Sequence, residues 1–451
     1  MVKKILWLND EKATARILFL TLSLLFSVVL IARQLSQTGH LIASDGVGYF
    51  VHLPSMLIDG DINYADDFAA FDRRGRNHWP VGCAIAWLPF YLIGHLVSLS
   101  GSALGVGWIT DGTGFSEQLA CCIGTIVYGS AAVALTYRLC CRWFQPRWAC
   151  LGVMLFFAGS NLPYYLLAEP YMSHGVAAFW TALLLYFGLS PTPLSAKKAA
   201  LIGVIAGLSA LTRPQDGLLI AVPLLYHLPT SSGRFLRAVG ISGFVSFLVF
   251  APQIAIWQDG LARQQSGPRQ HKKVPSPQRT SPKLSSQTPP VAEQASHARK
   301  PKPRGIERKS RIVPGGLLDW TSPKLYNELL GRHHGLLTWH PLYLLAFGGL
   351  LGMLFRYPKP ALVALVGVLI HTYIVGVWAG QGQTFGGRMF VSCFSLFALG
   401  LTSLLEDWKK IRIPVTLASL LSIAWNLVLM VRFRQLINSG TQVTFDKILD
   451  F

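Results

Sequence analysis

About eleven blocks of apolar residues divide this chain of 451 residues, and most of them are ~17–22 residues long. A helix of that length crosses the ~30 Å hydrocarbon core of a bilayer. Backbone polar groups in lipid must find partners within their own segment, so such blocks predict helices. With 51% hydrophobic and only 14% charged residues, the composition is also too apolar for an ordinary soluble protein. The sequence therefore predicts an all-α polytopic integral membrane protein with about eleven transmembrane helices.

Basic loops between the blocks predict the orientation, because Lys and Arg concentrate on the cytoplasmic side. The segment before the first block (Ala15 to Ala32) is basic, and this block is longer than a signal-peptide core, so we expect a retained first span. The other basic loops lie at Arg138–Arg147, Lys197–Lys198, Arg234–Arg237, Arg356–Lys359 and Lys409–Arg412. The remaining spans are then expected at about 118–139, 148–166, 174–190, 199–212, 216–228, 238–257, 336–355, 360–378, 388–405 and 413–431, with the C-terminus outside.

One apolar block, Pro80 to Ser98, does not fit this alternation, because counting it as a span would move the basic loop Arg138–Arg147 outside. Two prolines and two glycines in the block favour a shortened helix. We therefore expect it to lie in the outer interface or to dip back out. Residues 34–117 then form one large external loop that contains interfacial helices.

The chain is predicted to have two membrane modules, residues 1–261 and 313–451, joined by an insert at 262–312. The insert holds thirteen basic residues against Glu293 and Glu307, is rich in Pro and Ser, and has no apolar period. Such a segment is expected to be disordered. Its basic charge does not predict nucleic-acid binding, because the segment lies outside in this topology. The seven cysteines lie in or beside apolar blocks, with no spacing typical of disulfides or of a zinc site.

The unusual polar residues concentrate in the external elements. The first loop opens with Asp45, followed by a helix-like run, GVGYFVHLPSML. Asp45 could be a helix N-cap, or a carboxylate held at the membrane surface as a general base or metal ligand. Further external elements are the turns AEPYMSH (Ala168 to His174), TRPQDG (Thr212 to Gly217) and WAGQGQTFGGR (Trp378 to Arg388).

The order of these parts resembles the C-type glycosyltransferase superfamily, in particular the bacterial relatives of dolichyl-phosphate-mannose–protein mannosyltransferases and of aminoarabinose transferases. In that family an acidic residue leads into a first juxtamembrane helix, matched here by Asp45. A basic-Pro-Pro-Leu-Gly segment then leads into a second interfacial helix, and NHWPVGCAIAWLPFYL is similar to it, with His78 in place of the family lysine. The chain looks closest to a group of bacterial membrane proteins of unestablished substrate that carry segments like EPYMSH, LTRPQDG, RHHGLLTWHPLYLLA and FGGRMFVS.

The resemblance implies a membrane glycosyltransferase that moves a sugar from a polyprenyl-phosphate-linked donor to a lipid, glycan or protein acceptor. It implies action on the outer face of the bacterial cytoplasmic membrane. Asp45, Glu169 and His174 are then candidate catalytic residues, and Arg213, Arg388, His78 and Arg332 are candidates for binding the donor phosphate. Arginine suits that role because its planar fork donates bidentate hydrogen bonds to phosphate.

Several alternatives stay open. Arg213 and Arg388 could anchor helix ends by reaching to the interface, although the glycines beside Arg388 favour a backbone that approaches a ligand. His333 and His334 are more typical of a structural contact. The sequence predicts no cofactor and no residue set for a metal, and leaves a divalent metal open. The chain could instead be a transporter or flippase for a lipid-linked sugar, or a non-catalytic scaffold. A transporter would favour paired ionisable residues near helix midpoints and inverted repeats, and neither is evident.

Overall fold

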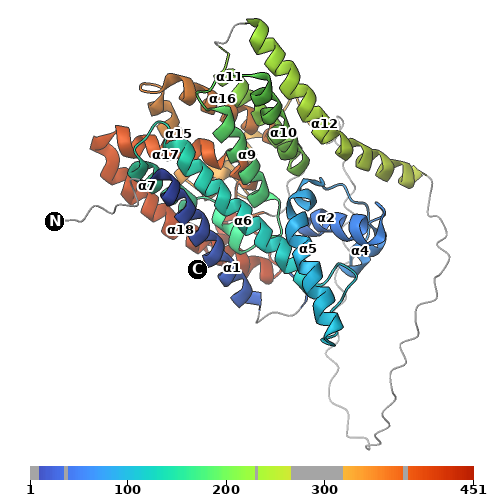
Figure 1. The fold of residues 1–451 in the computed structure, drawn as a ribbon. Coiled ribbons are helices and arrows are strands. Elements are labelled where there is room, and N and C mark those ends of the chain that lie inside the picture. Colours follow the sequence, from blue (N-terminus) through green and yellow to red (C-terminus); the bar gives the residue numbers. More distant parts are fainter. Residues whose placement is uncertain (1–9, 35–38, 229–231, 266–317, 379–383, 451) are drawn as a thin grey trace, which may run out of the picture.

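The computed structural model describes residues 10–34, 39–228, 232–265, 318–378 and 384–450, with side chains only to 259 in the third range (Figure 1). In these ranges the chain forms helices, and its β-structure is limited to one isolated bridge between Leu318 and Trp378. The elements are α1 (Glu11–Gln34), α2 (Asp45–Phe50), α3 (His52–Pro54), η2 (Ser55–Asp59), α4 (Ala65–Ala70), α5 (Gly82–Ala103), α6 (Phe115–Cys140), α7 (Pro146–Gly159), α8 (Leu162–Leu167), α9 (His174–Gly188), α10 (Ala196–Thr212), η3 (Pro214–Ile220), α11 (Ala221–Tyr226), α12 (Ser232–Gln265), α13 (Leu325–Leu330), α14 (Leu336–Trp339), α15 (Leu342–Met353), α16 (Pro358–Val377), η4 (Arg388–Cys393), α17 (Phe394–Asp407), η5 (Lys409–Ile411), α18 (Arg412–Asn438) and α19 (Phe445–Leu449).

The predicted fold class is confirmed: the protein is a polytopic helical membrane protein. Seven stretches in the described residues are long and apolar enough to cross a bilayer, and α7, α9 and α15 are shorter apolar helices. Large apolar side chains on the outer helices point away from the protein: Leu20 is 61% exposed, Phe244 63% and Leu421 72%. Such a band is stable only where lipid replaces water.

The loops expected outside the membrane meet at one end of the bundle, which we call the site end. Arg388 contacts Asp45, Arg213 contacts His174, and Gly46 lies directly against Tyr171. The basic loops meet at the other end, the basic end. There Tyr357 donates to the carbonyl of Trp143 (2.7 Å), and Arg412 lies over the ring of Trp148. The helices therefore alternate between two ends as the charge pattern predicts.

The block that did not fit the alternation forms α5, a 22-residue helix that continues through Pro89. The expectation that its prolines and glycines would shorten it is wrong, because Pro89 lies mid-helix without ending it. By length and composition α5 is among the seven possible spans. Its N-terminal Gly82 packs on the backbone of α10 at the site end, and Gly94 packs against the first turn of α6, also at the site end. This packing supports the prediction that α5 does not cross, and that prediction remains open to test.

Three expected spans are interrupted, and a fourth, 388–405, begins as the 3₁₀ element η4 before α17. The 148–166 span divides into α7 and α8 at Ser160–Asn161, and the 336–355 span divides into α14 and α15 at His340–Pro341. The 216–228 span is a 3₁₀ turn, η3, followed by the six-residue α11. At ~2 Å per 3₁₀ residue and ~1.5 Å per α residue, η3 and α11 together fall short of a bilayer core. Pro214 and Pro223 account for the break, since neither supplies a backbone N–H to a continuous helix.

The two parts of the chain on either side of the insert pack against each other. Gly152 of α7 lies against Thr402 of α17, and Thr136 of α6 bonds Ser395 of α17 at 2.6 Å. Residues 262–265 of the expected insert belong to α12, which lies along one edge of the bundle (Figure 1), and its remaining residues lie outside the described ranges. The prediction of disorder there stays a prediction.

Candidate active site

Arg388 projects from a tight turn at the site end. The preceding Gly387 has a φ of +60°, which favours glycine, and Gly386 packs directly on the ring of Trp339. Asn161, at the break between α7 and α8, donates to the carbonyls of Gly386 and Gly387 at 3.0 and 2.9 Å. The turn is therefore held rigidly just before Arg388.

Asp45 faces Arg388. The Nη1 atom of Arg388 donates to Oδ2 of Asp45 at 3.1 Å, with 16% of the arginine side chain and 31% of the aspartate side chain exposed. The N-cap position of α2 belongs to Ser44, and Asp45 is the first residue inside the helix. The Asp45 side chain therefore contacts a residue far along the chain instead of capping its own helix, and it remains accessible to a ligand.

Glu169 lies in the turn between α8 and α9. Its Oε1 accepts a hydrogen bond from Tyr164 at 2.8 Å. Burial raises the pKa of Glu169, and the charge of Asp45 acts in the same direction, whereas the Tyr164 bond and the charges of Arg434 and Arg388 oppose the rise. Asp45, Glu169 and Arg388 therefore share one electrostatic environment.

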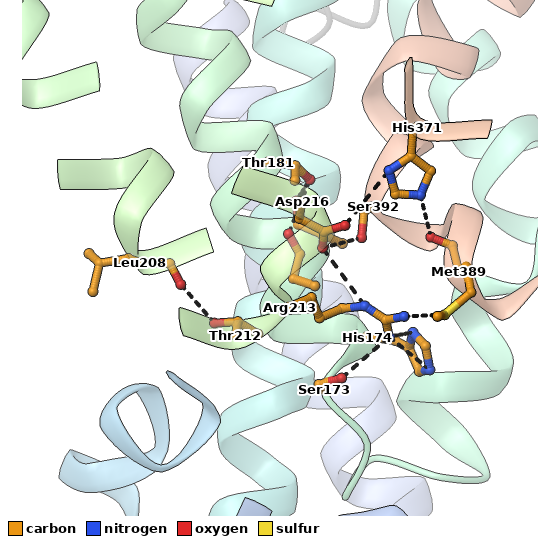
Figure 2. A network of polar contacts seen from close by, with 12 residues as sticks. Ser173, His174, Thr181, Leu208, Thr212, Arg213, Asp216, His371, Met389 and Ser392 are labelled. Atoms are coloured by element: carbon orange, nitrogen blue, oxygen red, sulfur yellow. Dashed lines mark hydrogen bonds and ion pairs between the residues drawn. The ribbon is translucent and has the colours of Figure 1, made fainter. Parts of the chain in front are cut away.

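Arg213 and His174, expected at this end, lie deeper, inside a polar network (Figure 2). Arg213 is only 6% exposed. Its Nη1 lies 2.8 Å from Nδ1 of His174 and 3.4 Å from Oγ of Ser173, and its Nη2 contacts the sulfur of Met389. The guanidinium is therefore occupied by protein partners.

Two buried residues that the sequence did not single out complete this network (Figure 2). Asp216 accepts from Ser392 at 2.5 Å, and Nε2 of His371 lies 2.9 Å from the carbonyl of Met389. Ser392 and Met389 both belong to η4, the element that Arg388 begins. The network therefore holds η4 in place from the buried side of the site.

The other two candidates form no hydrogen bond or ion pair with Asp45 or Arg388. His78 is exposed, stacks on Trp79 with ring centroids 3.7 Å apart, and accepts through its carbonyl from Trp257 of α12. Burial of part of the ring lowers the pKa of His78, and Asp45 is among the charges that raise it. Arg332 pairs with Asp446 at 3.1 Å near the C-terminus.

Two further arginines at the site end were not predicted. Arg434 acts on Glu169 from the last turns of α18, and Arg33 of α1 donates to the carbonyl of Leu167 at 2.7 Å, next to the same turn. Both follow an expected span at its external end, where basic residues are unusual. That position is the signal that could have identified them. In the described residues, no three His, Cys, Asp or Glu side chains form a group that could hold a metal ion.

No family model matches the chain, and no curated protein matches it. Among solved structures, the chain is similar to the crystal structure of ArnT from Cupriavidus metallidurans bound to undecaprenyl phosphate. The TM-score is 0.50 at 14% identity, over 96% of this chain and 73% of that one. The apo structure of the same protein gives a TM-score of 0.48 at 15% identity over the same shares. At this identity the likeness shows the fold.

Proposed function

We propose that this protein is a membrane glycosyltransferase that moves a sugar from a polyprenyl-phosphate-linked donor to an acceptor at the outer face of the cytoplasmic membrane. The observation that carries the proposal is the accessible Asp45–Arg388 pair at the end of the bundle opposite the basic loops. It combines a base with a phosphate-binding cation at the membrane surface, where the sugar–phosphate bond of a lipid-linked donor lies. The fold shared with a protein bound to undecaprenyl phosphate supports the donor class.

The proposed step follows from the two side chains. Asp45 takes the proton of an acceptor hydroxyl or amine, whose oxygen or nitrogen bonds to the anomeric carbon of the donor sugar. The bond from that carbon to the phosphate oxygen breaks, and its electron pair stays on the lipid phosphate. Arg388 moves its hydrogen bond from Asp45 to the departing phosphate and stabilises the negative charge that develops there. In the absence of substrate the same arginine holds the Asp45 side chain in place through their hydrogen bond.

We assign most of the remaining candidate residues to positioning the pair. Arg213 and His174 hold η4, and hence Arg388, in position instead of contacting the phosphate. Glu169 and Arg434 balance charge beside the pair. His78, exposed before α5, remains a candidate for the donor phosphate, whereas Arg332 lies with the C-terminal segment.

A transporter would place an ionisable pair near the middle of crossing helices. One buried pair in the described part of the chain, Asp216 and His371, lies against η4, the element that Arg388 begins, which is typical of support for a site at one end. The glycosyltransferase is therefore the function that this geometry favours.

Asp45→Asn tests the proposal, because it keeps shape and hydrogen-bonding capacity but removes the base. Purified protein in proteoliposomes receives a panel of undecaprenyl-phosphate sugars with inner-membrane lipids and periplasmic extract as acceptors, and release of undecaprenyl phosphate is measured. We expect the variant to lose ~10²–10⁴-fold in rate. The matched control is Asp66→Asn, an exposed acid of the same loop, which should keep the wild-type rate. If folded Asp45→Asn protein transfers sugar at the wild-type rate, the mechanism is wrong.

A further inference from the structure

A hollow of about 260 Å³ lies at the basic end, between the first turns of α1 and the end of α6. Its lining residues are Lys12, Ala15, Arg16 and Phe19 of α1 and Arg138 of α6. The volume is below the ~300 Å³ of a pocket for a drug-sized ligand, so it suits a small headgroup. The accessible Asp45–Arg388 pair lies at the other end of the bundle, so the hollow is no part of the proposed active site.

The four lining residues of α1 form one stripe along the helix. They are spaced i, i+3, i+4 and i+7, which places their side chains on one face. Lys12 and Arg16 are exposed, whereas Ala15 is buried and Phe19 packs partly buried against the core. The hollow therefore has charged groups at its rim and an apolar floor.

Arg138, on the α6 side, is held in a fixed position. Its Nε donates to Oε1 of Glu11 at 3.2 Å, and its guanidinium carbon lies 5.0 Å from the centroid of the Tyr186 ring. Neither of its Nη groups has a hydrogen-bond partner among the residues that the structure describes. With 33% of the side chain exposed, these donors remain available to an anion from outside the protein.

The positive charge at the rim is not balanced by the protein. The side chains of Lys12 and Arg16 form no hydrogen bond or ion pair with any residue in the described ranges. Glu11 is paired with the third lining cation, and the carboxylate of Asp10 accepts from two N–H groups in the first turn of α1, at 2.9 and 3.1 Å. Three cations against two occupied carboxylates leave the hollow with a net positive charge. Orienting a span requires basic residues at this end, but it does not require them to surround a hollow.

The hollow opens beside the lipid-facing surface of α1. Leu20 and Leu24 follow Arg16 at steps of four residues and are 61% and 69% exposed. α1 is one of the stretches long and apolar enough to cross a bilayer. A phosphate held at the rim would therefore have apolar surface next to it, along which acyl chains can lie. A soluble anion would make no use of that surface.

We propose that this hollow binds the headgroup of an anionic phospholipid from the leaflet at the basic end. Arg138 donates its two Nη groups to phosphate oxygens, and Lys12 and Arg16 neutralise the remaining charge. The acyl chains lie along Leu20 and Leu24. The lipid then bridges α1 and α6, and because it binds the folded state, it raises the thermal stability of the protein.

Lipid titration of the purified full chain in an uncharged detergent, followed by native mass spectrometry, tests the proposal. The probes are dioleoyl phosphatidylglycerol, dioleoyl phosphatidylcholine and inorganic phosphate. We expect phosphatidylglycerol to bind at least ~10-fold more tightly than phosphatidylcholine, whose headgroup carries its own cation. Lys12→Ala/Arg16→Ala should weaken phosphatidylglycerol binding ~30-fold, roughly fivefold for each basic residue removed near the bilayer surface. Both side chains are exposed, so the variant should fold.

The matched control is Lys409→Ala/Lys410→Ala, which removes two exposed lysines at the same end but outside the hollow. It should bind phosphatidylglycerol as the wild type does. Thermal unfolding gives a second readout. Phosphatidylglycerol should raise the Tm of the wild type and of the control, and should leave the Tm of Lys12→Ala/Arg16→Ala unchanged.

Two lipid results would overturn the proposal: equal affinity for phosphatidylglycerol and phosphatidylcholine, or wild-type affinity in Lys12→Ala/Arg16→Ala. Inorganic phosphate that displaces phosphatidylglycerol at a similar concentration would also overturn it, because the hollow would then be a site for a soluble anion. Asp45→Asn should bind phosphatidylglycerol as the wild type does, since the two sites lie at opposite ends. The lipid site therefore stands or falls separately from sugar transfer.

Discussion

Asp45 occupies the first helical position of α2. Ser44 occupies the N-cap position, where it has a φ of +52° and its side chain forms no capping hydrogen bond. An aspartate at the N-cap would direct its carboxylate to the N–H groups of its own helix. One position further, the carboxylate points to Arg388 instead. A register difference of a single residue thus separates a local capping role from a long-range one, and no sequence pattern resolves it.

Arg388→Lys tests whether the guanidinium fork matters at this position. Lysine keeps the positive charge, but its ammonium group cannot donate two parallel hydrogen bonds to two phosphate oxygens as the guanidinium does. We expect the rate of undecaprenyl phosphate release to fall at least ~10-fold and the donor KM to rise, because one donor to the phosphate is lost. The matched control is Arg356→Lys, which alters another Arg–Asp pair, with Asp407 at the basic end, and should leave both constants unchanged. A wild-type donor KM in Arg388→Lys would contradict a phosphate-binding role.

The buried carboxyl group of Asp67, in α4, should make the stability of the folded protein depend on pH. It is 5% exposed, and the structure gives its Oδ2 atom no hydrogen-bond partner among the described residues. Burial, followed by the charges of Asp59, Asp61, Asp66 and Asp111, raises its pKa to about 7. The folded state therefore holds this proton more tightly than the unfolded chain, whose aspartate titrates near ~4. Stability is greatest below that value, falls as the pH rises from ~4 to ~7, and is lowest above ~7.

Asp67→Asn should remove this dependence. At pH ~8 the variant should be the more stable protein by roughly 4 kcal/mol, and the difference should vanish near pH ~4. Thermal unfolding of both proteins across this pH range is the measurement. Asp72→Asn, at an exposed position of the same loop whose charge is not among those acting on Asp67, should follow the wild-type curve closely. A variant that loses stability with rising pH as the wild type does would exclude Asp67 as the source.

At the scale of elements, interruptions of helices build the site. The breaks at Ser160–Asn161 and His340–Pro341 meet, since Tyr343 of α15 donates to Oδ1 of Asn161 at 2.8 Å. Asn426 of α18 donates to the carbonyl of Ser160 at 2.7 Å, satisfying a group that the break leaves without a helical partner. Asn161 is thereby positioned to hold the turn before Arg388. The apolar pattern runs through both breaks, so it predicts uninterrupted spans.

The position of α5 is testable by labelling. Val106, 57% exposed just after α5, should react as Val106→Cys with a membrane-impermeant maleimide added from the outside. Five of the seven native cysteines are buried, so replacing Cys141 and Cys150 by Ser should remove the native thiols that could react with the maleimide. Ala196→Cys in the basic Lys197–Lys198 loop is the control and should react only after permeabilisation. Labelling of Val106→Cys only from the cytoplasmic side would show that α5 crosses.

At the scale of the whole molecule, the insert joins two parts that pack into one bundle. The contacts between the two parts, such as Thr136 of α6 with Ser395 of α17 and Gly152 of α7 against Thr402, involve no residue of the insert. We therefore expect replacement of residues 268–312 by a Gly/Ser linker of equal length to leave expression, thermal stability and the α5 labelling pattern unchanged. Loss of folded protein on this replacement would show that the insert carries structure.

The sequence by itself determined the class of the protein and its two ends. Apolar length predicts helices in lipid, and the placement of Lys and Arg divides the loops into the two sets that the structure brings together at opposite ends. Both signals are local, because each depends on the composition of one segment. The resemblance to known glycosyltransferases also directed attention to Asp45, Glu169, Arg213 and Arg388.

Only the tertiary structure decided what these residues contact. Arg213 and Arg388 look alike in sequence, each beside a turn at the same end. One is buried among His174, Ser173 and Met389, and the other faces an accessible carboxylate. The supporting residues Asn161, Asp216 and His371 carry no signal of their own, since their partners lie on other helices. Burial and pairing depend on how helices far apart in the chain approach, and that information is absent from any single segment.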